Sequence, residues 1–293
     1  MSITSTEITS QPDVWLTALG HTELAASLLA APGERMLVLG CGTSAFVAES
    51  LAALREGAGL GVTDAAYASE PRVWREYDRV VVISRSGTTT EVIDAIGAIP
   101  EGVRIVAVTG VADSPIARLA HDVLLLDFAD ERSVVQTRFP TAFLILVRAA
   151  FGEDVRPVVA EARAVLEAPV PLDAASFDHF VYLGTGWTLG LAQEAALKIR
   201  EAAQAWSESY PLLDYRHGPL AVAHDTSLVW MLGAADERLG AEIAATGATV
   251  RLSTLDPIVE LVQAQRLAVA LAESRGLDPD RPRHLTRSIV LAP

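Results

Sequence analysis

The sequence lacks the residues and segments on which several protein classes depend. Among its 293 residues there is one cysteine, Cys41, which rules out an internal disulfide framework. No apolar run approaches the roughly 18 residues that a membrane-spanning helix needs, and no basic and apolar leader opens the chain. We therefore expect a cytoplasmic protein with no membrane partner.

Basic side chains are also scarce. The chain has 23 Lys and Arg against 37 Asp and Glu, and the basic residues form no tract. Nucleic acids and anionic membranes require a concentrated basic surface, so neither is expected as a partner. A small anionic substrate would have to be held locally by backbone amides, hydroxyls and a few cations. The sequence shows no Walker or dinucleotide motif and no metal-ligand spacing, so we expect no cofactor and no metal.

Short apolar runs alternate with helical stretches from Arg35 onward, which is typical of a doubly wound parallel sheet. The runs span residues 36–40, 79–84, 104–109 and 122–127, and a second series spans 179–184, 227–233 and 248–253. Helices are predicted over about 12–31, 139–167 and 189–205 and from about 237. Residues 1–10 are polar and predicted to be loose.

A proline pair at Pro169 and Pro171 marks a boundary between the two series. The predicted organisation is an N-terminal arm and helix (1–34), a first α/β subdomain (35–168) and a second α/β subdomain with a C-terminal tail (169–293). Both series contain a Gly-x-Gly exit from a strand into a helix, beginning at Gly40 and at Gly184. This echo predicts two flavodoxin-like subdomains related by internal duplication.

Two turns that follow neighbouring strands predict a phosphate site in the first subdomain. The first is Gly40–Ser44, with Cys41, Gly42, Thr43 and Ser44, and the second is Ser84–Thr90, with Ser84, Ser86, Thr89 and the cation Arg85. Glycines allow close backbone approach, and hydroxyls add donors to the amides at a helix start. The alternative is that these Ser and Thr residues are ordinary helix N-caps. In the second subdomain the corresponding Gly-Ala-Ala-Asp stretch at 233–236 has no hydroxyls.

A second constellation lies on the predicted helix 189–205. Glu194, Lys198 and Glu201 are spaced to share one face, although a solvated stripe of charges has the same spacing. Further along, His217 lies in a polar turn closed by Gly-Pro. Histidine titrates near neutral pH and suits the opening of a cyclic sugar.

Taken together, these motifs resemble the sugar isomerase (SIS) family, and most specifically the isomerase domain of glucosamine-6-phosphate synthase, over roughly residues 35–290. The C-G-T-S motif at Cys41–Ser44 and the S-x-S-G-x-T motif at Ser84–Thr89 are similar to that family's phosphate-binding turns. Residues 131–138 resemble its sugar-pocket loop, in which Val134 and Gln136 lie, although Gln136 stands where a serine is usual. No glutaminase domain precedes these motifs, so we do not expect glutamine-dependent amide transfer.

The resemblance also implies roles for single residues. Glu201 would move a proton between C1 and C2, His217 would open the sugar ring from a neighbouring subunit of a homodimer, and Lys198 and Glu194 would contact substrate. Asp214 departs from the usual glutamate. Arg287 stands where the synthase has a lysine that forms a Schiff base, and a guanidinium cannot form that imine. It would instead stabilise an enediolate.

Three outcomes remain open for a sugar phosphate deprotonated at C2. The resemblance to the amino-sugar side of the family favours an isomerase or deaminase that acts on an amino-sugar 6-phosphate. The first alternative is a lyase or dehydratase acting on an N-acetylated amino-sugar 6-phosphate, such as N-acetylglucosamine 6-phosphate. The second is a non-catalytic sugar-phosphate sensor, which would not require Glu201 and His217.

Overall fold

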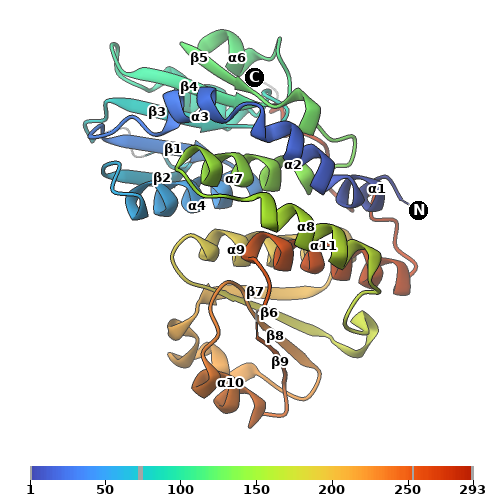
Figure 1. Ribbon diagram of the computed structural model, residues 1–293. Coiled ribbons are helices and arrows are strands. Elements are labelled where there is room, and N and C mark those ends of the chain that lie inside the picture. The colour runs from blue at the N-terminus through green and yellow to red at the C-terminus, as the bar shows by residue number, and fades with distance from the viewer. Residues whose placement is uncertain (1, 72–74, 253, 292–293) are drawn as a thin grey trace. The chain divides into compact units, whose positions relative to one another are not determined.

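Figure 1 shows the computed structural model of the chain, in which residues 2–71, 75–252 and 254–291 are described. The chain folds as two units, each built on one parallel sheet. The five-stranded unit comprises Ser10–Arg156 and the C-terminal segment from Thr286. The four-stranded unit comprises the N-terminal segment up to Thr9 and Pro157–Leu285.

The five-stranded unit has three layers, with helices on both faces of its sheet. Its strands, in the order β2-β1-β3-β4-β5, are β1 (Met36–Gly40), β2 (Thr63–Tyr67), β3 (Arg79–Ile83), β4 (Arg104–Thr109) and β5 (Asp122–Leu125). Helices α5 (Thr90–Gly97) and α6 (Pro115–Leu119) cover one face. The other helices of this unit are α2 (Gln11–Leu19), α3 (Thr22–Leu29), α4 (Thr43–Gly57) and α7 (Arg138–Ala150). All residues of β1 and β3 are buried, as expected for central strands of a parallel sheet.

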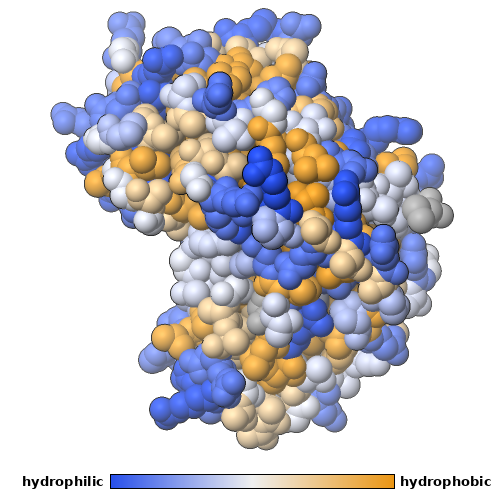
Figure 2. Space-filling view, in the orientation of Figure 1, coloured by the Kyte–Doolittle hydropathy of each residue, from blue (hydrophilic) through white to orange (hydrophobic). Residues whose placement is uncertain are grey.

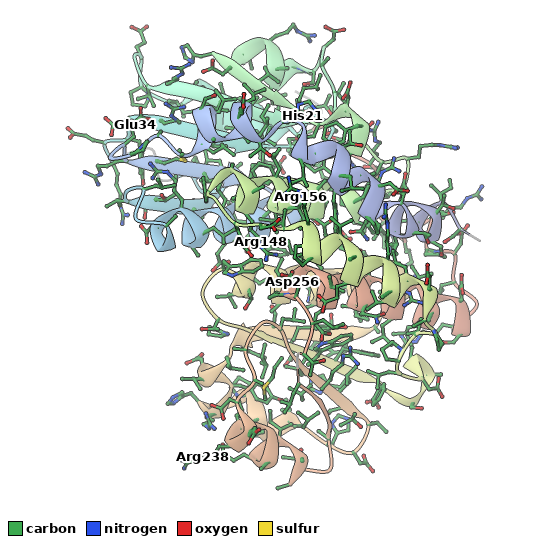
Figure 3. The ribbon with its side chains drawn as sticks, in the orientation of Figure 1. His21, Glu34, Arg148, Arg156, Arg238 and Asp256 are labelled. Atoms are coloured by element: carbon green, nitrogen blue, oxygen red, sulfur yellow. The ribbon has the colours of Figure 1, made fainter. Side chains whose placement is uncertain are left out.

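The four-stranded unit repeats this plan. Its strands, in the order β7-β6-β8-β9, are β6 (His179–Gly184), β7 (Trp206–Pro211), β8 (Ser227–Met231) and β9 (Thr249–Arg251). Helix α10 (Glu237–Ala244) packs on one face and shows hydrophilic side chains to solvent in Figure 2. The other helices are α1 (Ile3–Thr9), α8 (Arg156–Glu167), α9 (Thr188–Ala203) and α11 (Pro257–Ser274). Asp256, labelled in Figure 3, caps α11 by accepting from the amide of Ile258 at 2.9 Å.

The two units share a strand and helix order, which confirms the predicted duplicated α/β fold. The succession β1-α4-β2-β3-α5-β4 matches β6-α9-β7-β8-α10-β9. A glycine also occupies the same place in both. A Cβ atom on Gly40 would lie 2.5 Å from the backbone carbon of Ser44, and one on Gly184 would lie 2.3 Å from the backbone oxygen of Thr188. Each strand exit therefore requires a residue without a side chain.

The N-terminal prediction was wrong in two respects. Residues 3–9 form helix α1 rather than a loose arm, because the carboxylate of Asp280 accepts from the backbone amides of Ile3 and Thr4 at 2.7 and 2.8 Å. The predicted helix over 12–31 is broken at Gly20 into α2 and α3. At the break, the ring of His21, labelled in Figure 3, stacks on Phe128 with centroids 5.1 Å apart.

Other boundaries also differ from those predicted. The helical stretch 139–167 is two helices, α7 and α8, and α8 belongs to the four-stranded unit, whereas the predicted division placed residues 157–168 in the first subdomain. The segment from Thr286 belongs to the five-stranded unit, because its hydrogen bonds reach residues of that unit. Ser253, the last residue of the predicted run 248–253, lies outside the described residues. Within them, no helix is both long enough and apolar enough to cross a membrane.

Candidate functional site

The first predicted turn lies where β1 ends and α4 begins. Gly42 has φ of +53°, a conformation that favours glycine, and it is the N-cap residue of α4. Thr43 and Ser44 are buried. Burial, followed by the nearby charge of Glu91, raises the pKa of the half-buried Cys41 thiol, so this thiol stays protonated at neutral pH.

The second predicted turn follows β3, which pairs with β1 in the sheet. Gly87, with φ of +66°, allows the chain to fold back so that its amide donates to the Ser84 hydroxyl at 3.2 Å. The hydroxyls of Ser84 and Thr89 are 3.0 Å apart. The Ser86 hydroxyl accepts from the amide and the hydroxyl of Thr88, at 3.3 and 3.1 Å. Four hydroxyls therefore gather in a single turn before α5.

The helix-cap alternative is wrong for both turns. Helix α4 has a glycine at its N-cap, and Thr89, the N-cap residue of α5, makes no side-chain bond to the helix. A capping hydroxyl would accept from an amide one turn into the helix. The hydroxyls of Ser84 and Ser86 instead accept from amides of their own turn, and those of Ser84 and Thr89 lie within hydrogen-bond distance of each other.

Arg85, predicted to add charge to the phosphate site, has only 2% of its surface exposed. Its guanidinium donates to the carbonyl oxygens of Ser133 and Arg287, at 2.8 and 3.0 Å. These bonds join the second turn to two other segments of the same unit. Arg85 thereby orders this region in addition to carrying charge.

The loop that holds Val134 and Gln136 is shaped by Glu131, a residue to which the sequence analysis gave no role. The buried carboxylate of Glu131 accepts from the amides of Thr137 and Arg138, at 2.6 and 2.9 Å, and from the Thr137 hydroxyl at 2.7 Å. A carboxylate at the start of α7 also complements the helix dipole. Val134 and Gln136, both half-buried, lie within the stretch that this carboxylate closes.

The C-terminal segment brings Arg287 and two further residues to the same region. The Arg287 guanidinium pairs with the Asp130 carboxylate, with its terminal nitrogen 2.6 Å from Oδ2. The Ser288 hydroxyl accepts from Ser86 at 3.0 Å and from Thr88 at 2.8 Å. Sequence reasoning missed Asp130 and Ser288, because a single serine in a tail and a single aspartate in a loop carry no spacing that marks them.

The catalytic helix candidates lie on α9 in the four-stranded unit. Lys198 and Glu194 are each 1% exposed, so the alternative of a solvated stripe is wrong. The Lys198 ammonium lies 3.2 Å from Glu194 and 2.6 Å from Glu201, whose side chain is 19% exposed. Burial alone would lower the pKa of Lys198, but the two carboxylates outweigh it and raise the pKa. Lys198 is therefore held charged, and Glu201 is the least buried of the three.

His217 follows the short helix η3 (Leu213–Arg216), after the end of β7. Its backbone amide donates to the Asp214 carbonyl at 2.8 Å, and its side chain is exposed. An exposed imidazole at the end of a turn is accessible to a second molecule. The predicted site residues thus fall into two groups, with 41–44, 84–89, 134, 136 and 287 in the five-stranded unit and 194, 198, 201 and 217 in the four-stranded unit.

Known proteins resemble this chain in sequence and in fold. The model of the SIS domain matches residues 28–151. The chain is 29% identical to a glutamine–fructose-6-phosphate aminotransferase (isomerizing) of Pyrobaculum aerophilum, over 92% of the chain and 53% of the relative. It thus spans about half the length of the curated relatives it matches.

Solved structures are similar over nearly the whole chain. A glucosamine-6-phosphate deaminase from Thermotoga maritima superposes with a TM-score of 0.87 and 27% identity, covering 99% of this chain and all of that one. A tagatose-6-phosphate ketose/aldose isomerase from Escherichia coli shares the fold, with a TM-score of 0.80, 20% identity and coverage of 100% and 96%. Residues 28–151 of this chain therefore match the SIS domain, and the whole chain shares its fold with these solved structures.

Proposed function

We propose that this protein is an enzyme that acts on a phosphorylated sugar, specifically an amino-sugar 6-phosphate, as an isomerase or deaminase. The observation that carries the proposal is the set of hydroxyls before α5, which cap no helix and face one another across a turn. The chain has a net charge of −14, so the protein as a whole does not attract a phosphate. Hydroxyls and the amides at a helix start can bind phosphate without such a positive field. The relative named a glucosamine-6-phosphate deaminase supports the choice of an amino sugar.

In this proposal Glu201 is the base that takes the proton from C2 of the open-chain sugar. Two features support that role. Its carboxylate is partly exposed, and the Lys198 ammonium at 2.6 Å fixes its position. Arg287 is paired with Asp130, and a guanidinium forms no imine, so the reaction we propose proceeds through an enediolate-type intermediate without a covalent adduct.

The test follows the C2 proton. Glucosamine 6-phosphate, incubated with the protein in D₂O, should exchange its C2 proton, and NMR should show ketose phosphate with or without released ammonia. Sodium borohydride should trap no adduct. Glu201→Gln, which keeps the shape of the side chain but cannot accept a proton, should slow exchange by about 10²- to 10⁴-fold. Glu273→Gln, which changes an exposed carboxylate on α11, is the matched control and should exchange normally.

The other outcomes discriminate among the alternatives. An olefinic product from N-acetylglucosamine 6-phosphate would replace the proposal with a dehydratase. Tight binding of the phosphosugar with no exchange would point to a sensor. Full exchange in Glu201→Gln would show that another group is the base.

Phosphate recognition has its own test. Ser86→Ala combined with Thr89→Ala should weaken binding of glucosamine 6-phosphate by about 1–3 kcal/mol, because charge-assisted hydrogen bonds are lost. Calorimetry should also find that the wild-type protein binds free glucosamine far more weakly than its 6-phosphate. Equal affinities for the two sugars would contradict the phosphate site.

We further propose a homodimer in which His217 serves the partner's site, as the exposed position of this side chain permits. Sedimentation at micromolar concentration should then show at least a dimer. Mixing Glu201→Gln chains with His217→Ala chains should restore part of the activity, because one site of each heterodimer keeps both groups. A verified heterodimer without recovery would count against a shared site.

A further inference from the structure

Three hydroxyls from two segments far apart in the sequence meet beside the turn after β3. Ser288 accepts from Ser86 at 3.0 Å and from Thr88 at 2.8 Å, and Thr88 also lies 3.1 Å from Ser86. Each hydroxyl has one proton to donate and can rotate to direct it elsewhere. A phosphate placed beside this triangle is a stronger acceptor than a neutral hydroxyl, so it would draw the protons toward itself.

The position of Ser288 is fixed by bonds on both sides of it. On the N-terminal side, Arg85 holds the carbonyl of Arg287 at 3.0 Å. On the C-terminal side, the Thr90 amide donates to the carbonyl of Ile289 at 3.2 Å. The amide of Leu291 then donates to the Thr90 hydroxyl at 2.9 Å.

These bonds make the segment part of the turn's own structure. They place the Ser288 hydroxyl against Thr88, in the turn just before the N-terminus of α5, where the helix dipole favours an anion. The Arg287 guanidinium is engaged by Asp130, so the segment contributes a neutral donor here. A group positioned in advance loses little entropy when it binds a ligand.

We propose that Ser288 is a ligand of the phosphate group, so that the C-terminal segment Thr286–Leu291 adds a hydroxyl from outside the turn to the site. The nature of the anion rests on the function proposed above. In the bound state Ser86, Thr88 and Ser288 each donate to a phosphate oxygen instead of to one another.

Calorimetric titration with inorganic phosphate and with glucosamine 6-phosphate tests the proposal in the full chain. Ser288→Ala should weaken the binding of both ligands by about tenfold or more, as Ser86→Ala should, because a hydroxyl bond to a charged group is lost. Ser288→Thr keeps the hydroxyl and should stay close to wild type. Ser274→Ala, which removes a hydroxyl bonded within α11, is the matched control and should bind like wild type.

Unchanged affinity in Ser288→Ala would overturn the proposal, and so would tighter binding, which would make Ser288 a competitor of the phosphate. A second measurement needs no variant. Phosphate should slow hydrogen exchange of the Leu291 amide in the wild-type protein, because a ligand bound by both the turn and the C-terminal segment holds the two together. Unchanged or faster exchange would overturn the proposal. If the wild-type protein binds neither ligand, the proposed function fails; if it binds both and Ser288→Ala is unaffected, only the present inference fails.

Discussion

The ammonium nitrogen of Lys198 lies 2.6 Å from a carboxylate oxygen of Glu201 and 3.2 Å from one of Glu194, one helical turn away on either side. Glu194 and Lys198 are buried, whereas Glu201 reaches partial exposure. The buried pair is thus fixed in place while Glu201 remains accessible, an arrangement that suits the base proposed above.

Replacing Lys198 with Met should destabilise the protein by about 3–5 kcal/mol, because the buried Glu194 carboxylate loses its cation. Urea unfolding followed by circular dichroism measures the change. Adding Glu194→Gln to Lys198→Met should recover part of the loss, since the buried negative charge is removed as well. A single variant as stable as wild type would show that this carboxylate is compensated elsewhere.

Arg55, fully buried at the end of α4, should be among the most sensitive positions of the five-stranded unit. Its guanidinium donates to several carbonyl oxygens, among them those of Ala31 at 2.7 Å and Glu34 at 3.0 Å, and to the Thr63 hydroxyl at 2.7 Å. Ala31 and Glu34 precede β1 in the sequence, and Thr63 is the first residue of β2. The Arg55 side chain therefore joins the segment that leads into β1 to the start of β2.

Arg55→Met should lower the free energy of unfolding by at least about 3 kcal/mol, because several buried carbonyls lose their donor. The stability of Arg55→Lys should lie between those of the wild-type protein and Arg55→Met, since an ammonium keeps the charge but cannot replace the planar guanidinium. Arg156→Met, at an arginine whose side chain is 80% exposed, is the control and should change stability by less than about 0.5 kcal/mol. Equal effects of Arg55→Met and Arg156→Met in urea would contradict the prediction.

Gly40→Ala should damage the turn Gly40–Ser44, which we propose to bind phosphate. Its Cβ would lie 2.5 Å from the Ser44 backbone, which must shift, at a cost of about 1–3 kcal/mol. Gly57→Ala, at a helical position with open space around it, should be neutral or stabilising by up to about 1 kcal/mol. Thermal unfolding and phosphate titration of both variants check this, and a Gly40→Ala protein that binds phosphate like wild type would refute it.

The pH dependence of His224 has a definite sign. The Val222 carbonyl, 2.9 Å from Nδ1, and then the Asp178 carboxylate, 3.1 Å from Nε2, raise the pKa of His224 above its usual 6.5. The stability contributed by His224 is therefore fully present below its unfolded pKa and lost as the pH rises through its folded pKa. The ring of His179 stacks on it, with centroids 5.6 Å apart.

NMR titration of the His224 imidazole should give a pKa above 6.5 in the wild-type protein. Asp178→Asn should lower the pKa of His224, because the carboxylate that helps to raise it is removed while the Val222 carbonyl remains. Asp173→Asn, which removes a carboxylate bonded to Ala175 and Ser176, serves as the control and should leave it unchanged. An identical pKa in wild type and Asp178→Asn would rule out the carboxylate as a cause.

The central strands of both sheets could be predicted from the sequence, because a strand covered on both faces is a continuous run of β-branched and other apolar residues. Of the four edge strands, β5 and β9 lie within predicted apolar runs, whereas β2 (TDAAY) and β7 (WSESYP) could not be predicted, since their small and polar residues form no such run. Helix α1 was missed for a related reason. Its polar sequence gives little helical signal, and its start is held by Asp280, which is remote in the sequence.

The candidate site divides in the same way. The turns at Gly40–Ser44 and Ser84–Thr90 have local signatures, a glycine with hydroxyls after an apolar run, and both could be located in advance. Glu131 and Ser288 act through partners that only the fold brings near them, so no spacing marks them. The burial of Arg85 was equally inaccessible, because an arginine in a hydroxyl-rich turn gives no sign of whether its guanidinium meets solvent or carbonyl groups.

The ends of the chain are exchanged between the two units. The first nine residues belong to the four-stranded unit, and the last residues belong to the five-stranded unit. No single cut can therefore separate the protein into two complete halves. A fragment ending at Arg156 would keep the turns Gly40–Ser44 and Ser84–Thr90 but lose Ser288 and the bonds around it, while helix α1 would be left without Asp280. To produce the five-stranded unit alone, residues 286–291 would have to be connected to Arg156 by a linker. To produce the four-stranded unit alone, α1 would have to be connected to Pro157, so the chain would need a new connection at two places.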